Sequence, residues 1–104
     1  MDNKDQYIIS MFQQYLIECG VEHNSTTMRL SYDISGLDTK KSRLFEIAYE
    51  KFIIDFEQDG GILPLPEYIQ DEMFIASINI LNDWENNNPR FLENAKQYIN
   101  IEVA

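Results

Sequence analysis

The sequence predicts a mainly α fold, a compact four-helix bundle-like single domain over residues 1–104. Apolar residues recur at helical spacing in four segments, and most of the intervening segments are short and rich in glycine, proline or asparagine. Hydrophobic residues make up 44% of the chain and charged residues 25%, which is ordinary for a globular protein. A chain of this length is expected to bury one hydrophobic core.

The first predicted helix covers residues 4–19. Asp2 or Asn3 can cap its start, and Gly20 offers a left-handed residue that would stop it. Its apolar residues recur every three or four positions, at Ile8, Met11, Phe12, Tyr15, Leu16 and Cys19. We therefore expect this helix to turn one apolar stripe toward the core.

The segment after the first helix has a different pattern. Apolar and polar residues alternate over 28–34, which is the period of a half-buried strand. A strand needs a partner for its backbone groups, and 99–103 is the only other alternating stretch. The two segments are expected either to pair as a small two-stranded β element or to be irregular or helical.

Three more helices are marked by capping and helix-breaking residues. The second begins near Asp38 and ends before Asp59-Gly60-Gly61. The third is expected over 66–85, because a proline suits the first position of a helix. The pair Asn88-Pro89 then starts a last helix over about 89–98. The four helices together are typical of a compact bundle.

The net charge of −10 is distributed unevenly. Residues 46–85 hold ten acids and one base, Lys51, which gives −9. Residues 1–45 hold six acids and five bases, and residues 86–104 hold two of each, which gives −1 and 0. Nearly all of the negative excess therefore belongs to the second and third helices and their connection.

Clustered acids repel one another on a helix. Glu46 and Glu50 are four residues apart, as are Glu67 and Asp71, and each such pair destabilises its helix by a few tenths of a kcal/mol. A cationic partner would relieve this repulsion. The candidate partner-binding residues are Glu46, Glu50, Glu57, Asp59, Glu67, Asp71 and Glu72. The alternative is a solvated acidic face that serves only solubility.

The sequence predicts no catalytic, cofactor-binding or metal site. Cys19 and His23 are the only cysteine and the only histidine, and a helix stop at Gly20 would separate them. Cys19 also falls on the apolar stripe of the first helix, as a buried structural thiol does. The sequence lacks a di-iron Glu-x-x-His pair, a calcium-binding loop and a phosphate-binding glycine loop. We therefore expect a protein that is not an enzyme.

The remaining expectations concern location and partners. The chain has no run of roughly 20 apolar residues, and its first residues lack the basic and apolar regions of a signal peptide. We expect a cytoplasmic protein that does not bind a membrane. A net charge of −10 disfavours direct binding to nucleic acid and favours basic protein partners.

Size, charge and helical character favour an inhibitor that binds another protein. The leading hypothesis is an immunity protein that neutralises a basic, nuclease-type bacterial toxin by occluding its substrate cleft. One alternative is a phage-encoded DNA mimic that inhibits restriction or CRISPR defence. Another is a non-catalytic adaptor or self-assembling helical protein, for example a homodimer. These hypotheses are functional analogies based on size and charge.

Overall fold

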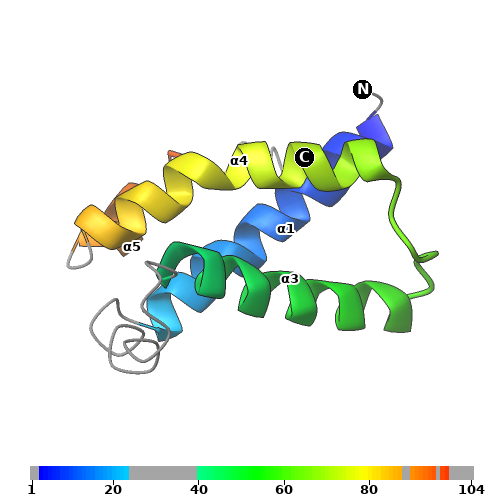
Figure 1. Cartoon of the computed structure of the whole chain (residues 1–104), viewed down its shortest axis with the longest axis horizontal. Coiled ribbons are helices and arrows are strands. Elements are labelled where there is room, and N and C mark those ends of the chain that lie inside the picture. The colour runs from blue at the N-terminus through cyan, green and yellow to red at the C-terminus, as the bar shows by residue number, and fades with distance from the viewer. Residues whose placement is uncertain (1–2, 24–39, 88–89, 96, 99–104) are drawn as a thin grey trace.

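The computed structural model describes residues 3–23, 40–87, 90–95 and 97–98. Its helices are α1 (Asn3–Glu22), α3 (Lys40–Gln58), α4 (Glu67–Asn86) and α5 (Phe91–Ala95). Helices α3 and α4 run antiparallel, α1 crosses behind both, and α5 follows α4 beside the end of α1 (Figure 1). The mainly α fold predicted from the sequence is confirmed, with α5 shorter than the predicted helix over 89–98.

The predicted two-stranded β element is not confirmed. Its segments, 28–34 and 99–103, lie outside the described residues. The part of the chain that the structure describes contains helices, turns and bends but no strand. None of the described helices has the length and apolar character that a membrane span requires.

The prediction that α1 stops at Gly20 is wrong, because the helix continues to Glu22. A Cβ atom on Gly20 would lie 2.6 Å from Cε2 of Phe91 and 3.1 Å from Cδ1 of Trp84. The glycine thus allows α4 and α5 to approach the backbone of α1 closely. It meets a packing requirement here and does not end the helix.

The core lies where α1 packs against α3 and α4. Phe12 of α1 is fully buried and makes edge-to-face contacts with Phe45 and Phe52 of α3, at centroid distances of 5.3 and 5.8 Å. From α4, Met73, Ile80 and Trp84 are also fully buried. Complete burial of a large apolar side chain stabilises the fold by about 1.5–3 kcal/mol. Because α1 contributes to both interfaces, it fixes α3 and α4 relative to each other.

The connection between α3 and α4 begins in an exposed turn and ends at a core residue. Gly60 has a φ of 93°, a conformation that suits glycine, and Leu65 is buried. Pro66 was predicted to be the first residue of the helix, but it immediately precedes α4, and its carbonyl oxygen accepts a hydrogen bond from the backbone N–H of Ile69 at 3.0 Å. The connection is therefore short, and the burial of Leu65 anchors it just before α4.

Candidate functional site

Five of the seven predicted acids form two exposed strips. On α3, Glu46, Glu50 and Glu57 are separated by four and seven residues and therefore share one side of the helix. On α4, Glu67 and Asp71 are four residues apart and share one side of that helix. All five are exposed. We refer to these two groups as the acidic strips.

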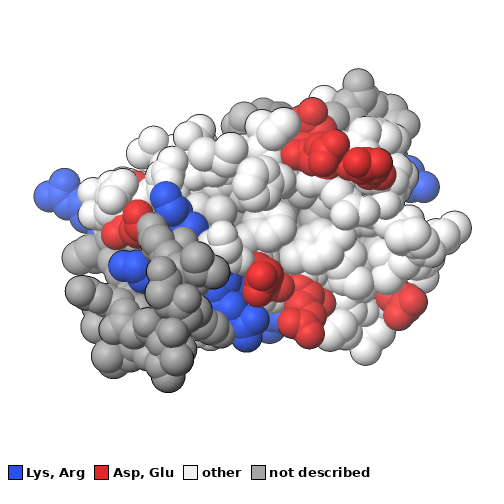
Figure 2. All heavy atoms as spheres, in the orientation of Figure 1, with Lys and Arg blue, Asp and Glu red and all other residues white. Residues whose placement is uncertain are grey.

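The acidic strips belong to neighbouring helices. Figure 2, in the orientation of Figure 1, shows acidic side chains over α4 and over α3, with a band free of charge between them. Lysine and arginine side chains gather toward the end where α3 begins. A partner that approached this face would meet carboxylates on both sides of an uncharged centre.

The other two predicted acids do not extend the acidic strips. Asp59 is exposed but follows the last residue of α3, in the turn where its N–H bonds to the carbonyl oxygen of Asp55 at 3.0 Å. Glu72 is half-buried and directly follows Asp71, so it projects about 100° away around α4. The structure therefore gathers five of the seven predicted residues and leaves these two apart.

Few cations offset the acidic strips. Arg43 forms an ion pair with Glu46 at 3.2 Å, between two exposed side chains. Lys51, the one base among residues 46–85, instead pairs with Glu22 of α1 at 3.7 Å. Among the ion pairs of the described residues, Glu46 is the only member of the acidic strips involved. The other four carboxylates of the acidic strips thus have no ion pair within the described part of the chain.

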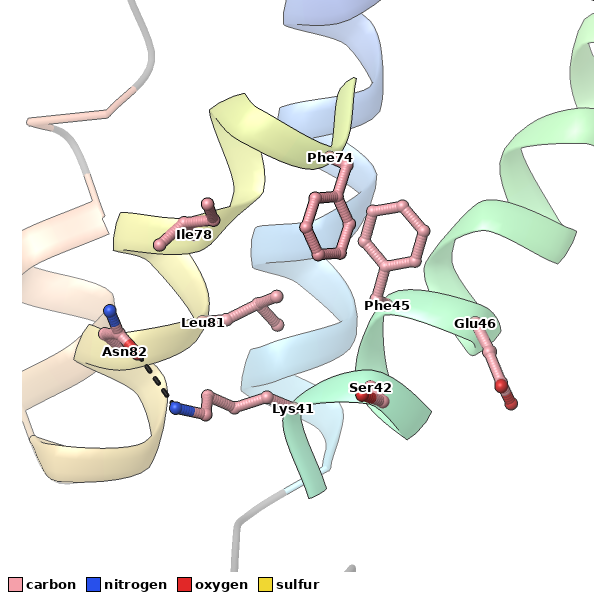
Figure 3. Close-up of a pocket in the computed structure, with 8 residues that line it drawn as sticks. All are labelled: Lys41, Ser42, Phe45, Glu46, Phe74, Ile78, Leu81 and Asn82. Carbon is pink, nitrogen blue, oxygen red and sulfur yellow. Dashed lines mark hydrogen bonds between the residues drawn. The ribbon is translucent and has the colours of Figure 1, made fainter. Parts of the chain in front are cut away.

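An apolar groove of about 510 Å³ lies between the first two turns of α3 and residues 74–82 of α4. The rings of Phe45 and Phe74 meet in its wall at a centroid distance of 5.6 Å and an angle of 71°. The residues that line the groove are labelled in Figure 3: Lys41, Ser42, Phe45, Glu46, Phe74, Ile78, Leu81 and Asn82. We refer to this feature as the α3–α4 groove.

One end of the α3–α4 groove is fixed by Lys41. Its Nζ donates a hydrogen bond to Oδ1 of Asn82 at 2.9 Å and lies 3.7 Å from Oε1 of Glu85 (Figure 3). Both partners are on α4, so the contact links the start of α3 to the end of α4. Because its partners among the described residues are Asn82 and Glu85, Lys41 forms no ion pair with the acidic strips.

Two apolar side chains of the groove are strongly exposed, Phe74 at 55% and Ile78 at 44%. Ile75, next to Phe74 but outside the groove lining, is 58% exposed. Glu67, Asp71, Phe74 and Ile78 follow one another at intervals of four, three and four residues, so they lie along one side of α4. The acidic strip of α4 thus continues into an exposed apolar patch, a combination typical of protein-binding sites.

Sequence reasoning missed this apolar patch. Tyr68, near the start of α4, is also 55% exposed and donates a hydrogen bond to Asp5 at 3.0 Å, whereas Trp84, near the end of α4, is buried. A signal was present, since Phe74, Ile75 and Ile78 extend the apolar residues of α4 beyond the width of one face.

Cys19 and His23 contribute to the packing and hydrogen bonding at the end of α1. Cys19 is buried, and burial raises the pKa of its thiol above the ordinary value. Nδ1 of His23 lies 3.0 Å from the carbonyl oxygen of Cys19, where it closes the last turn of α1. Within the described residues, no three histidine, cysteine, aspartate or glutamate side chains are grouped so that they could hold a metal ion.

Comparison with known proteins gives no relative for this chain. No protein-family model, curated protein or solved structure matches it.

Proposed function

We propose that this chain is an immunity-type inhibitor that binds a basic, nuclease-type bacterial toxin through α3 and α4 and covers the substrate cleft of the toxin. The observation that carries the proposal is the pair of acidic strips, five exposed carboxylates on neighbouring helices. In this proposal the chain is not an enzyme. It acts in the bacterial cytoplasm by occlusion and needs no cofactor.

The electrostatic argument concerns the cleft of the partner. A nuclease binds phosphates with lysine and arginine side chains, and carboxylates at regular helical steps can occupy the same positions. Complementary charge steers the encounter and raises the association rate, most strongly at low ionic strength. Binding would also relieve the repulsion within each strip, for example between Glu46 and Glu50.

A phage-encoded DNA mimic would use the same surface, and only the partner would differ. The restriction or CRISPR protein that it blocked would also be basic, since such proteins hold the phosphates of DNA. The acidic strips support both forms of the proposal equally. Identification of the captured partner separates the two.

The test is a pull-down from the native host with the wild-type chain and with the Glu50→Lys/Asp71→Lys variant, one substitution in each acidic strip. We expect the wild-type chain to capture a basic protein and to inhibit its nuclease activity in a one-to-one complex. Capture by the variant is expected to weaken by at least about a hundredfold, because two favourable charge contacts become repulsive. A steep loss of affinity with added salt should accompany specific capture.

The control reverses the same amount of charge elsewhere. Glu18 on α1 and Glu93 on α5 are exposed and lie outside both acidic strips. The Glu18→Lys/Glu93→Lys variant has the same net charge as the test variant, so it should retain most of the capture. Equal losses in the two variants would mean that only net charge matters. Unchanged capture by Glu50→Lys/Asp71→Lys would refute the proposal.

A further inference from the structure

We propose that the α3–α4 groove receives an amphipathic, cationic α-helix of the partner. The apolar side of that helix would lie against Phe45, Phe74 and Ile78, and its lysine or arginine side chains would reach the acidic strips. This inference rests on the proposed function, because it names the structural element of the basic partner that the same face binds. It adds an apolar anchor to an interaction proposed above on electrostatic grounds alone.

The groove has the geometry of a helix-binding site. It lies between two antiparallel helices, where a third helix can pack its ridge of side chains. Phe74 and Ile78 are one helical turn apart, so they can contact apolar side chains that are similarly spaced on the incoming helix. Addition of a strand is disfavoured, since the described residues offer no sheet edge.

The wall of the groove is already ordered by contacts with the core. The ring of Phe45 packs edge-to-face on the buried Phe12 at 5.3 Å and stacks with Tyr49 at 6.0 Å. It also supports Phe74 from the other helix, at 5.6 Å. A groove whose side chains are held in place loses little conformational entropy on binding, so more of the contact energy remains as affinity.

Charge favours a cationic occupant. Glu46 lies at the rim of the groove, with its carboxylate directed away from Phe74 and Ile78 (Figure 3), and Asp71 lies one turn before Phe74 on the same side of α4. An incoming helix with lysine or arginine beside its apolar face would therefore place cations near both helices. A second copy of this chain is the less favourable occupant, because each copy carries a net charge of −10 and the acidic strips would face each other.

The experiment uses a fluorescent synthetic helix of about five turns, with leucine along one side and lysine along the other. Its binding is measured by fluorescence anisotropy. Two control peptides separate the contributions: one replaces the leucines with serine and keeps the lysines, and the other replaces the lysines with glutamate. We expect the leucine–lysine peptide to bind the wild-type chain, the serine peptide to bind at least about tenfold more weakly, and the glutamate peptide not to bind.

The protein variants test the location. Phe74→Ser/Ile78→Asn removes two exposed apolar side chains from the groove and should weaken binding of the leucine–lysine peptide by at least about tenfold. The matched control is Ile54→Asn/Leu92→Asn, at positions that are 52% and 64% exposed and do not line the groove. This control should bind within about twofold of the wild-type chain. Circular dichroism checks the helical content of each variant.

Ile78→Asn alone is the fallback if the double variant loses helical content, and it should still weaken binding severalfold. The inference fails if the peptide does not bind the wild-type chain, or if the groove variants bind it as well as the control variant does. It also fails if the wild-type chain is a dimer that Ile78→Asn dissociates, since a second copy would then occupy the groove. If the groove variants behave like the control while Glu50→Lys/Asp71→Lys still loses the native partner, the proposed function stands without the groove.

Discussion

The indole Nε1 of Trp84 donates a hydrogen bond to the carbonyl oxygen of Gly20, 3.0 Å away, and a second bond to that of His23, 2.8 Å away. Trp84 belongs to α4, and the two acceptors lie at the end of α1. The last carbonyls of a helix have no partner within it, so the indole satisfies groups that would otherwise be buried and unpaired. This contact fixes α4 on α1 and thereby helps to position the acidic strip of α4.

The Gly20→Ala variant should be less stable than the wild-type chain. Alanine favours a helix over glycine by about 1 kcal/mol, but the added methyl group would lie 2.6 Å from the Phe91 ring. Overpacking of this kind costs about 1–3 kcal/mol, so we expect a net loss in the free energy of unfolding. Urea denaturation measures the change, and Val21→Ala, at an exposed neighbouring position, is the control. A gain in stability would show that α5 moves aside without cost.

The sequence alone predicted the helices well and the role of Gly20 badly. Apolar spacing around Phe12 or Met73 reports directly which side of a helix is buried, because the period is a local property. A glycine late in a helix has the same local signature whether it ends the helix or permits close packing. The presence of Phe91 above Gly20 is decided by tertiary structure, about 70 residues further along the chain.

The same limit applies to the candidate site. The acidic strips were predictable, because the spacing of Glu46, Glu50 and Glu57 follows from helix geometry once α3 is assigned. The apolar half of the surface was not. Exposure of Phe74 depends on how far α3 and α4 are held apart. Tertiary contacts set that distance, through the packing of both helices on α1 and the contacts of Lys41 with Asn82 and Glu85.

The stability of the chain at alkaline pH should depend on the hydrogen bond that Tyr15 donates to Asp55, at 2.6 Å. This bond, followed by burial and nearby carboxylates, raises the pKa of Tyr15 from 10.0 to about 12. The folded state therefore holds the phenolic proton more tightly, and the stability from this group is complete below pH 10 and lost as the pH rises to about 12. In Tyr15→Phe, the free energy of unfolding should fall less steeply over that interval.

Asp55→Asn is the companion variant for the Tyr15 prediction. It removes the main cause of the raised pKa, so the tyrosinate absorbance of Tyr15 should appear at lower pH than in the wild-type chain. Spectrophotometric titration of the wild-type, Tyr15→Phe and Asp55→Asn chains isolates the contribution of this one tyrosine. A Tyr15 that titrates near pH 10 in the wild-type chain would contradict the contact.

Cys19 should react slowly with thiol reagents while the chain is folded. Its side chain is 1% exposed, and burial raises the pKa of the thiol, which lowers the fraction of reactive thiolate at neutral pH. We expect labelling by a disulfide reagent to follow the rate of unfolding and to become fast in denaturant. Rapid labelling of the native chain, measured by mass spectrometry, would instead indicate that the end of α1 opens readily.

Neutralising one acid of a strip should stabilise the chain. In Glu50→Gln the repulsion with Glu46, four residues away, is removed, and we expect a gain of a few tenths of a kcal/mol at low ionic strength that disappears at high salt. Glu22→Gln changes the charge by the same amount but breaks the ion pair with Lys51 at 3.7 Å, so it should give no gain or a small loss. Urea denaturation at two salt concentrations compares the two variants.

The two variants are expected to differ because Glu22 has an ion-pair partner, whereas Glu50 faces another acid one turn away. If both variants gained stability equally, relief of the total charge would explain the result and the position of Glu50 would not matter. If Glu50→Gln gained nothing, the strip would carry no repulsion for a partner to relieve. A gain at Glu50 alone would mean that the free chain is destabilised by the surface proposed to bind, and that a cationic partner recovers this energy only in the complex.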